Sequence, residues 1–397
     1  MVRIGASRMT PIDFAAHPLP GAEMHELLAR LRDQGPLADA AFGGKPCLVT
    51  TRFDTLLEGF QDVETFPPAT LYQNTIAKVI GPNFQSMEGE QHLLYRRLAT
   101  PAFRSRAIER YGDEEMAGLA HEILDRLERE SETDLVESFT HLFPFFVICR
   151  LVGVPRENEN QFHRWAWEML GAPGVRFEVS RKAAEEFTRH LKPAVEARRS
   201  EPRDDVISAL LETEADGRKL TDDEIFSHVR LMFSAGATTT LDGIGSLLHS
   251  LLSEGDAWQQ VVEQPELRPG AIQETLRWEP PVPNLPRISA RETTEFCGHE
   301  LAPGTVVLFS MASANRDPEV CADSQRFDIT RPETRILTFG RGIRSCPGMH
   351  LARKEMAVAL DAIAERFPRL RLLGAPRDSA PSGALVRGPK TLPVALA

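Results

Sequence analysis

The longest helical pattern in the sequence runs from Thr221 to Ser253. It opens with TDDE, in which the Thr221 hydroxyl can cap the first turn and the Glu224 carboxylate can reach back to the Thr221 amide. Asp222 and Asp223 stand where the helix dipole favours negative charge. An unbroken helix of this length measures about 50 Å at a rise of about 1.5 Å per residue. A helix that long usually crosses the core, so we expect the rest of the chain to pack around it.

Inside this pattern lies SAGATTTLDG, from Ser234 to Gly243, which is unfavourable for a helix. Its consecutive threonines have restricted χ1 rotamers, and their hydroxyls compete for backbone carbonyls one turn back. Gly236, just before them, costs about 1 kcal/mol relative to alanine. Two interpretations compete: a functional site at the point of conflict, or a bend that lets neighbouring elements pack closely. The rest of the chain decides between them.

The composition is that of an acidic globular protein. The 397 residues are 42% hydrophobic with a formal net charge of −11, which allows a substantial core and disfavours nucleic acid as a partner. The N-terminal sequence lacks the basic region, apolar run and cleavage site of a signal peptide. The most apolar stretch, Phe143 to Val154, is too short to span a bilayer. We therefore expect a soluble, cytoplasmic monomer without a membrane partner.

Helical and strand-like patterns divide the chain unequally. No repeat, low-complexity tract or linker interrupts it, so we expect a single domain over residues 1–397. Helices are expected to dominate at about 90–280 and 346–367. Strands and irregular segments are expected at about 36–60, 285–345 and 368–397. The predicted fold class is mainly α with a minor β part (α+β).

The cysteines point to a single chemical site. There are five of them without any CxxC pair, which argues against a disulfide framework and a structural zinc site: Cys47, Cys149, Cys297, Cys321 and Cys346. Only Cys346 has a distinctive setting, FGRGIRSCPG, just before a helix start. The helix terminus and the nearby Arg341 and Arg344 are expected to lower the pKa of its thiol. Such a thiolate can be a nucleophile or a metal ligand, and a single one in a glycine-rich loop suits an axial heme ligand.

This loop resembles the heme-ligand motif of cytochrome P450, FGxGxHxCxG. The matching positions are Phe339, Gly340, Gly342, Cys346 and Gly348, while Arg344 replaces the histidine and keeps a cation for a heme propionate. The resemblance implies that the Cys346 thiolate is the axial ligand of heme b (iron protoporphyrin IX). It also implies the cytochrome P450 fold, with a long central helix over the heme.

Further motifs follow in the order found in that family. ETLR resembles ExxR, whose Glu274 and Arg277 lie at i and i+3 and would form a structural network with Arg326 of QRF. EQHLLYRR resembles EHxxxRR and implies that His92 and Arg96 bind a propionate. Arg287 in LPRIS matches the family's other propionate-binding position, so the resemblance implies that it too binds a propionate.

The threonine segment resembles the family pattern [AG]-G-x-[DE]-T-T. Ala235, Gly236, Thr239 and Thr240 match it, and the resemblance implies that Gly236 leaves room for dioxygen while Thr239 hydrogen-bonds the iron-bound oxygen. Where the family pattern has an acidic residue, this chain has Thr238, which cannot relay a proton as a carboxylate does. Asp242 lies one turn further on. We hypothesise that Asp242 or an additional water takes over the relay; the alternative is a charge that faces solvent or caps a neighbour.

The resemblance implies a heme-thiolate monooxygenase that inserts one oxygen atom from O₂ into a small to medium hydrophobic substrate. Electrons would come from a ferredoxin or flavodoxin. The missing acid at Thr238 leaves an alternative open, a peroxide-driven or non-oxygenating enzyme such as a peroxygenase, isomerase or dehydratase. A non-catalytic heme sensor is a third class, which the full set of motifs disfavours.

This interpretation predicts a substrate pocket and a surface for the electron donor. Variable pocket segments are expected at 70–85, 169–177, 231–239, 282–285 and 382–386. On the cysteine side, a basic patch would steer an acidic electron donor. Its expected members are Arg341, Arg344, Arg353, Lys354, Arg104 and Arg106.

Overall fold

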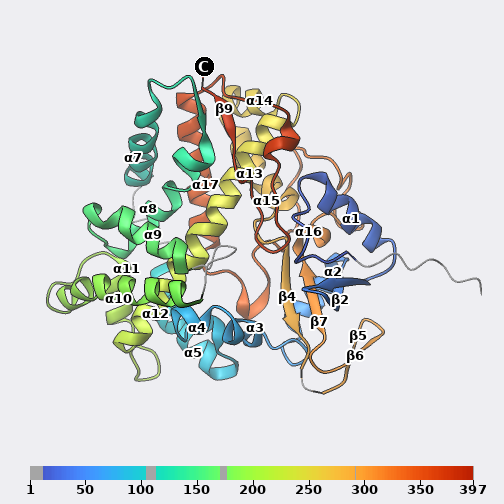
Figure 1. The fold of residues 1–397 in the computed structure, drawn as a ribbon, viewed down its shortest axis with the longest axis horizontal. Helices are drawn as coiled ribbons and strands as arrows, with labels where there is room; N and C mark the ends of the chain where they lie inside the picture. The colour runs from blue at the N-terminus through green and yellow to red at the C-terminus, as the bar shows by residue number, and fades with distance from the viewer. Residues whose placement is uncertain (1–11, 104–112, 170–176, 291, 397) are drawn as a thin grey trace, which may run out of the picture.

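The structure is a computed structural model that describes residues 12–103, 113–169, 177–290 and 292–396. Helices make up most of it, and most strands gather on the right-hand side of Figure 1. The α-helices are α1 (Ala22–Arg32), α2 (Phe53–Gln61), α3 (Ala69–Asn74), α4 (Ala77–Ile80), α5 (Gly89–Ala99), α7 (Asp113–Leu124), α8 (Phe143–Val152), α9 (Glu159–Met169), α10 (Phe177–Ser200), α11 (Val206–Glu212), α12 (Asp222–Leu231), α13 (Thr238–Ser253), α14 (Ala257–Glu263), α15 (Arg268–Trp278), α16 (Met311–Ala314) and α17 (Met349–Arg366). The predicted class, mainly α with a minor β part, is confirmed.

The strands form small sheets. The largest has the order β1–β2–β7–β4, in which β2 and β7 are parallel and the other pairs antiparallel. Its strands are β1 (Leu37–Phe42), β2 (Lys45–Thr50), β7 (Val306–Ser310) and β4 (Asn284–Ile288). The others are β3 (Glu132–Asp134) with β9 (Pro393–Ala395) and β8 (Arg371–Leu372), and the hairpin of β5 (Thr294–Phe296) and β6 (His299–Leu301). The sheets thus join the N-terminal region to segments hundreds of residues away.

The central helix begins as expected but is not a continuous α-helix. Thr221 Oγ1 accepts from the Glu224 amide, and Glu224 Oε2 accepts from the Thr221 amide at 2.8 Å, which forms the expected capping box. After α12, however, residues Met232–Ala237 form a π-helical segment before α13 begins at Thr238. An i→i+5 turn of this kind is common at functional sites. The unfavourable sequence therefore interrupts the helix at the glycine and threonine segment.

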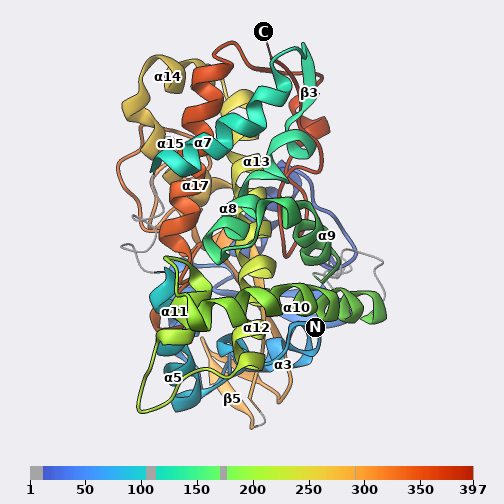
Figure 2. The same ribbon diagram turned by 90° about the vertical axis from the view of Figure 1, so that its left-hand side faces the viewer.

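The core is built around α13, the yellow helix at the centre of Figure 1. It packs against α8, α15 and α17, and α8 and α17 lie beside it in Figures 1 and 2. Leu247, Leu248 and Leu251 of α13 are fully buried. Burying each such side chain contributes about 1.5–3 kcal/mol before entropy is counted. This packing holds the threonine segment at a fixed place in the interior.

A buried ion-pair network fastens the N-terminal helix to the C-terminal region. Glu279 follows α15; its Oε1 lies 2.7 Å from His25 Nε2 of α1, and its Oε2 accepts from Arg387 Nε at 2.6 Å. Arg387 also donates to the carbonyls of Leu19 and Gly21. Burial by itself would raise the pKa of Glu279, but Arg387 and His25 hold it well below its usual range. The carboxylate therefore stays charged and links three segments of the chain.

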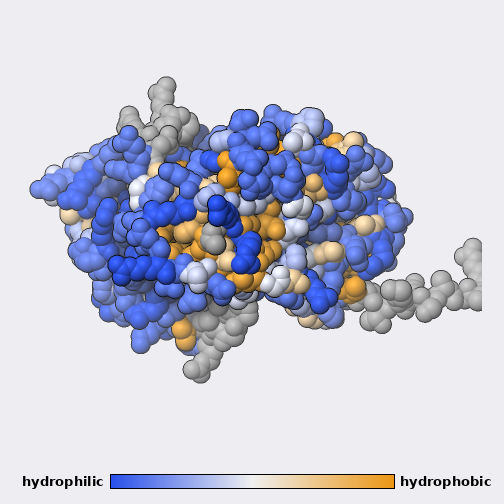
Figure 3. Space-filling view, turned by 90° about the horizontal axis from the view of Figure 1, so that it is seen from above, coloured by the Kyte–Doolittle hydropathy of each residue, from blue (hydrophilic) through white to orange (hydrophobic). Residues whose placement is uncertain are grey.

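The outer surface is mainly hydrophilic. Figure 3 shows apolar residues gathered near the middle of the upper face, within a hydrophilic surround. Among the residues that the structure describes, no helix combines the length and apolar character needed to cross a membrane.

Candidate heme site

The cysteine loop is shaped by glycines and a backbone hydrogen bond. Gly340 and Gly342 have φ values of +66° and +74°, the left-handed region that favours glycine. The loop closes where the Cys346 amide donates to the Phe339 carbonyl at 2.9 Å. Two residues later, α17 begins at Met349. The loop thus presents one sulfur atom directly before a helix N-terminus.

The thiol of Cys346 has solvent-accessible surface and is nevertheless closely surrounded by protein, which places it in a recess. Burial raises the pKa of this thiol above its ordinary value, while the Gly348 amide and Arg96 oppose the shift. The expectation that Arg341 and Arg344 lower this pKa is therefore wrong for the protein alone. Arg341 is exposed, and Arg344 is engaged elsewhere. Coordination to a metal, which requires the thiolate, would overcome this burial cost.

A cluster of cations lies beside the loop. Arg96 of α5 donates to the Ser345 carbonyl at 2.5 Å. Arg344 donates to Glu88 Oε2 at 2.6 Å and to backbone carbonyls, including those of Phe84 and Gln85 at 3.3 Å. Its Nε atom is buried and has no hydrogen-bond partner among the residues that the structure describes. The guanidinium groups of this cluster thus have more N–H donors than the neighbouring protein oxygens accept.

His92 is the clearest sign that something is to be bound here. It is fully buried on α5, and neither of its ring nitrogens has a partner in the described part of the chain. Burial, and then the positive charges of Arg344 and Arg96, lower the pKa of His92 to about 4. A neutral imidazole with unpartnered nitrogens beside two guanidinium groups fits an acidic ligand such as a heme propionate.

Arg287 of β4 adds a further buried cation. Its guanidinium lies 5.7 Å from the centre of the Phe309 ring and donates to the Pro286 carbonyl at 3.2 Å. No carboxylate within the described ranges forms an ion pair with it. Burial lowers the pKa of Arg344, and the charge of Arg287 adds to this shift, so the two guanidinium groups repel each other. Such a site is completed by an anion between the cations.

The threonines after the π-helical segment share one hydrogen-bonding pattern. The Oγ1 atoms of Thr238, Thr239 and Thr240 donate to the carbonyls of residues 234, 235 and 236 at 2.9, 2.9 and 2.8 Å. Ala235 and Gly236 are half-buried, and a Cβ atom on Gly236 would meet Ile148 at 3.4 Å. The hydroxyls therefore supply donors to carbonyls that a π-helix leaves without their usual i+4 amides.

Asp242 faces the C-terminal loop. It is buried, and a Cβ atom on Gly388 would lie 2.1 Å from its Oδ1. Burial raises the pKa of Asp242 to about 6, and Lys390 partly opposes the rise. The interpretation of Asp242 as a solvent-facing charge is therefore wrong. A buried carboxyl that titrates near neutral pH keeps the relay hypothesis chemically reasonable.

The ExxR pair forms a buried fork. Arg277 Nε and Nη2 donate to Glu274 Oε2 and Oε1 at 2.7 and 2.8 Å. Arg277 Nη1 also donates to the carbonyls of Asn315 and Ser324, which lie in the irregular segments before the cysteine loop. The pair thus links α15 to segments for which the sequence shows neither helical nor strand periodicity.

The third member of this network is Arg331, and the expectation of Arg326 is wrong. The Arg326 side chain is 69% exposed and pairs with Asp328; only its carbonyl accepts from Arg277. Arg331 Nε instead lies 3.2 Å from both Glu274 oxygens. The turn after Phe327 brings the later arginine inward because the Asp328 amide also donates to Glu274. A basic residue just before Pro332 is the only sequence signal that could have identified it.

The expected basic patch is only partly available. Arg341 is exposed, whereas Arg353 donates to Gln273 and lies over the Phe339 ring. Lys354 is half-buried and engaged in an interaction. Arg104 and Arg106 lie outside the described residues, as do residues 170–176 of the expected pocket segment 169–177.

Comparisons with known proteins identify the family of this chain. A family model described as cytochrome P450 matches residues 14–394. Cytochrome P450 107B1 of Saccharopolyspora erythraea is 32% identical over 386 residues, covering 94% of this chain and 95% of the relative. The 6-deoxyerythronolide B hydroxylase of the same organism is 32% identical over 394 residues, covering 94% and 96%. The structure of myxobacterial cytochrome P450 CYP267B1 in complex with myristic acid superposes with a TM-score of 0.86 at 31% identity, covering 96% of this chain and 98% of that one. The chain belongs to the cytochrome P450 family.

Proposed function

We propose that this monooxygenase binds heme b through the Cys346 thiolate and oxidises a small to medium hydrophobic compound. Membership of the family establishes heme iron, O₂, an organic substrate and an electron donor as its requirements. The observation that carries the residue assignment is His92, buried with unpartnered ring nitrogens beside Arg96 and Arg344 and close to the cysteine loop.

The residues on the cysteine side would bind and orient the cofactor. Arg96, Arg287 and Arg344 would pair with propionates, His92 would donate a ring N–H, and Cys346 would ligate the iron through its Sγ. When bound, the heme supplies the site where O₂ is activated, with one oxygen atom passing to substrate and the other leaving as water. The Glu274–Arg277–Arg331 network would keep the loop in place beneath it.

The residues of the π-helical junction would manage protons. Ala235 and Gly236 would leave room for dioxygen, and the Thr239 hydroxyl would give up its bond to the Ala235 carbonyl to hold dioxygen or a water. Thr238 Oγ1 donates in the same way to the Ser234 carbonyl, but its side chain has no carboxyl group to relay a proton. Asp242 would supply a proton, since its raised pKa leaves part of its carboxyl protonated near neutral pH.

The same departure at Thr238 favours one second candidate, a peroxide-driven oxygenase. With peroxide as oxidant, both oxygen atoms and their reducing electrons arrive together, so the demand for relayed protons and for a partner is smaller. Turnover with hydrogen peroxide in the absence of a redox partner, at a rate matching the partner-supported reaction, would favour this candidate.

The substrate chamber is expected to be apolar. Leu231, which ends α12, is buried, and Ile76 and Val79 near α4 pack against the same core cluster. The relatives include a hydroxylase of 6-deoxyerythronolide B, and a structural neighbour binds myristic acid. These names, together with the apolar side chains in two of the expected pocket segments, support a hydrophobic substrate class.

The electron donor is proposed to be an acidic ferredoxin or flavodoxin. The protein carries a net charge of −11, so a local cation near the cysteine loop would direct a donor to that face. Arg341 is exposed there, beside Ile343, whose side chain is 51% exposed. A cation next to an exposed apolar residue is typical of a small, transient interface.

The visible spectrum of the purified protein, reduced with dithionite and exposed to carbon monoxide, tests the central assignment. A strongly red-shifted Soret band indicates heme bound through the Cys346 thiolate. Cys346→Ser should abolish that band, while Cys297→Ser, which alters another surface thiol, should leave it unchanged. Absence of the band from the wild-type protein would refute the proposed ligand.

A further inference from the structure

Arg344 of the cysteine loop forms an ion pair with Glu88, the residue directly before α5. Glu88 Oε2 accepts from Arg344 Nη2 at 2.6 Å. Only 11% of the Arg344 side chain is exposed, whereas 40% of the Glu88 side chain is. The pair therefore joins a buried cation of the candidate heme site to an acid that reaches the surface.

The second carboxylate oxygen of Glu88 binds a different helix. Glu88 Oε1 accepts from the Ala69 amide at 2.5 Å, and Ala69 is the first residue of α3. The residue before it, Pro68, provides no side-chain cap for this helix. One carboxylate thus connects the cysteine loop, the start of α5 and the start of α3, which leads into the expected pocket segment 70–85.

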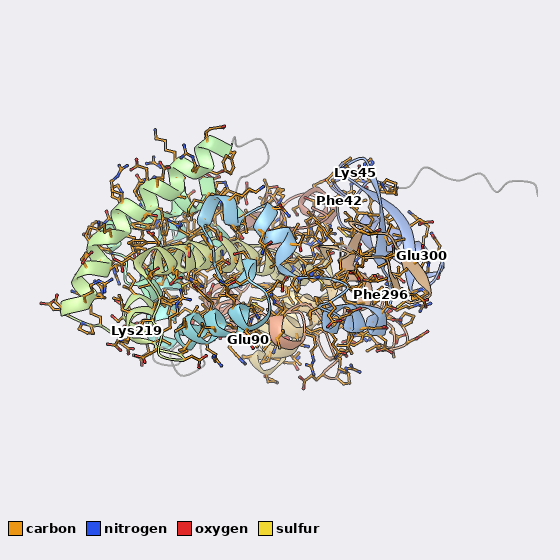
Figure 4. All side chains as sticks on the ribbon, turned by 90° about the horizontal axis from the view of Figure 1, so that it is seen from below. Phe42, Lys45, Glu90, Lys219, Phe296 and Glu300 are labelled. Atoms are coloured by element: carbon orange, nitrogen blue, oxygen red, sulfur yellow. The ribbon has the colours of Figure 1, made fainter. Side chains whose placement is uncertain are left out.

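The same parts of the chain meet at the 3₁₀ turn Phe84–Ser86, which both α3 and α5 contact. Gln73 Nε2 of α3 donates to the Ser86 carbonyl at 2.8 Å. The first two carbonyls of the turn accept from Arg344 Nη1 at 3.3 Å each. These helices lie at the lower end of the molecule in Figure 1, the face that Figure 4 shows from below. The guanidinium of Arg344 and α3 therefore share one support.

An arginine at this position has to be oriented by its surroundings. The family motif has a histidine here, whereas Arg344 has a long side chain that loses more rotamer freedom when it is fixed. Its Nη1 and Nη2 atoms donate to residues 84–88, while its Nε atom, buried, has no hydrogen-bond partner in the described part of the chain. The surrounding acceptors thus fix the guanidinium by its terminal nitrogens and leave Nε for another acceptor.

Glu88 also supplies the negative charge that this guanidinium needs. Burial lowers the pKa of Arg344, and the Glu88 carboxylate is the strongest influence in the opposite direction. Arg287 adds a positive charge nearby. Removing one partner of a buried ion pair is costly, because the remaining charge is left uncompensated. Glu88 therefore stabilises Arg344 in the place where a propionate would meet it.

We propose that Glu88 is a positioning residue for heme: one carboxylate oxygen orients Arg344 for a propionate, and the other holds the start of α3 through the Ala69 amide. The inference rests on the proposed function, because it takes Arg344 to be a propionate ligand. A single acidic side chain then couples the retention of heme to the placement of the pocket segment that follows α3.

The first experiment follows the transfer of heme from the holoprotein to an excess of apomyoglobin. Glu88→Gln keeps an oxygen for the Ala69 amide but removes the carboxylate, so heme should leave about tenfold faster, as expected for the loss of one charged hydrogen bond. Arg344→Gln should accelerate transfer by at least as much, and the double variant should be no faster than Arg344→Gln alone. Effects that multiply in the double variant would overturn the proposal, because Glu88 would then not act through Arg344.

Glu90→Gln is the matched control. Glu90, labelled in Figure 4, is exposed in the first turn of α5, so this variant removes an equal charge close by in the sequence. It should leave heme transfer unchanged, and Glu88→Asp, which keeps the carboxylate, should restore part of the retention. A loss in Glu90→Gln equal to that in Glu88→Gln would count against the proposal, since it would indicate only a general charge effect.

The reduction potential of the heme distinguishes positioning from a general loosening of the site. Glu88→Gln removes a negative charge beside the cations that would bind propionates, which should shift the potential upward. Arg344→Gln removes a positive charge and should shift it downward. Shifts of the same sign in both variants would indicate a structural effect alone and would refute the assigned role.

The link to α3 is measured by hydrogen–deuterium exchange of the holoprotein. Arg344 donates to residues 84, 85, 87 and 88, which lie outside α3. Arg344→Gln should nevertheless speed exchange of the amides of residues 69–75, because it releases Glu88. Arg353→Gln, which removes a bond to Gln273 beside the same loop, is the control and should leave that segment as it is. Unchanged exchange over 69–75 in Arg344→Gln would exclude the coupling.

The two levels of interpretation fail in different ways. If the carbon monoxide band is absent from the wild-type protein, the proposed heme ligand fails. If the band is present and Glu88→Gln releases heme at the wild-type rate, the ligand assignment stands and the role of Glu88 is refuted.

Discussion

Asp242 of α13 and Gly388 of the C-terminal loop fit together so closely that a Cβ atom on Gly388 would lie 2.1 Å from Asp242 Oδ1. Gly388 does not have a positive φ, so space and not backbone conformation requires a glycine there. The adjacent Pro389 makes a similar contact, 2.8 Å from a Cβ atom on Gly245. The C-terminal part of the chain therefore packs closely against α13, the helix that carries the threonines.

Gly388→Ala should destabilise the protein by about 1–3 kcal/mol, because overpacking forces the loop or the carboxylate to move. Urea unfolding measures the change. Gly118→Ala is the control, since nothing lies near that position and alanine favours a helix. Combining Gly388→Ala with Asp242→Ala should recover part of the loss; strictly additive effects would contradict a direct clash.

Asp242 should make stability fall as the pH rises. Burial raises the pKa of its folded-state carboxyl to about 6, above an unfolded value of about 3.9, so the folded state binds the proton more tightly. The stabilisation is complete below about pH 4 and is lost as the pH rises to about 6, by roughly 2–3 kcal/mol in total. Asp242→Asn should remove this component from unfolding curves at pH 5 and 8. The exposed Asp54→Asn should leave the profile as it is; an unchanged profile in Asp242→Asn would contradict the burial argument.

The same Asp242→Asn variant tests the relay. If Asp242 delivers protons, product formed per O₂ consumed should fall and its pH dependence should flatten. Unchanged coupling and an unchanged pH profile would leave the relay to water alone.

Arg331→Leu should cost about 3–5 kcal/mol, because it leaves the buried Glu274 with fewer of its charged partners. Arg326→Leu should change stability by no more than about 0.5 kcal/mol, because its exposed side chain forms one ion pair, with Asp328, and lies outside the buried fork. Thermal unfolding and heme content, measured in parallel, distinguish the two. Equal losses in both variants would mean that the network extends to Arg326.

Thr239→Ala should lower the yield of product per O₂ several-fold while changing stability little. Thr240→Ala loses the same kind of hydroxyl-to-carbonyl bond one residue later and serves as the control. Uncoupling in both variants to the same extent would indicate that the helix, not the Thr239 hydroxyl, is responsible.

Reduction by an acidic ferredoxin should slow as salt is added between low and physiological ionic strength, because screening shortens the reach of surface charges to about 8 Å. Arg341→Gln should reduce both the rate and its salt dependence. Arg377→Gln, an 89% exposed cation outside the cysteine loop, should alter neither. Rates independent of salt would exclude electrostatic steering of the donor.

Much of the heme site was predictable because short motifs carry it. Short motifs that resemble those of the family predicted the loop around Cys346, the fork of Glu274 and Arg277, and the early-helix pair His92 and Arg96. The capping box at Thr221 could likewise be predicted from the sequence, since its two residues lie within one helical turn. Their roles toward heme and oxygen remain predictions for the experiments above.

Other features depend on contacts between distant segments, which one sequence does not specify. Arg331 takes the place predicted for Arg326 because the chain after Phe327 turns back on α15, and the family resemblance had favoured the wrong arginine. The raised pKa of the Cys346 thiol follows from how many atoms surround it, not from the nearby arginines in sequence. Asp242 and Gly388 meet only through tertiary packing.

The π-helical segment at Met232–Ala237 also sets the phase between the two halves of the central helix. A π-helical turn takes in about one residue more than an α-helical turn, so a single-residue deletion that restored α-helical hydrogen bonding would leave α12 and α13 facing as they do now. If the segment became α-helical without a change in length, α12 would rotate relative to α13 by about 100°, the turn of one α-helical residue. Arg230 and Thr239 would then face different surroundings, although neither residue had changed. In this stretch of the chain, the number of residues and the hydrogen-bonding pattern are therefore linked.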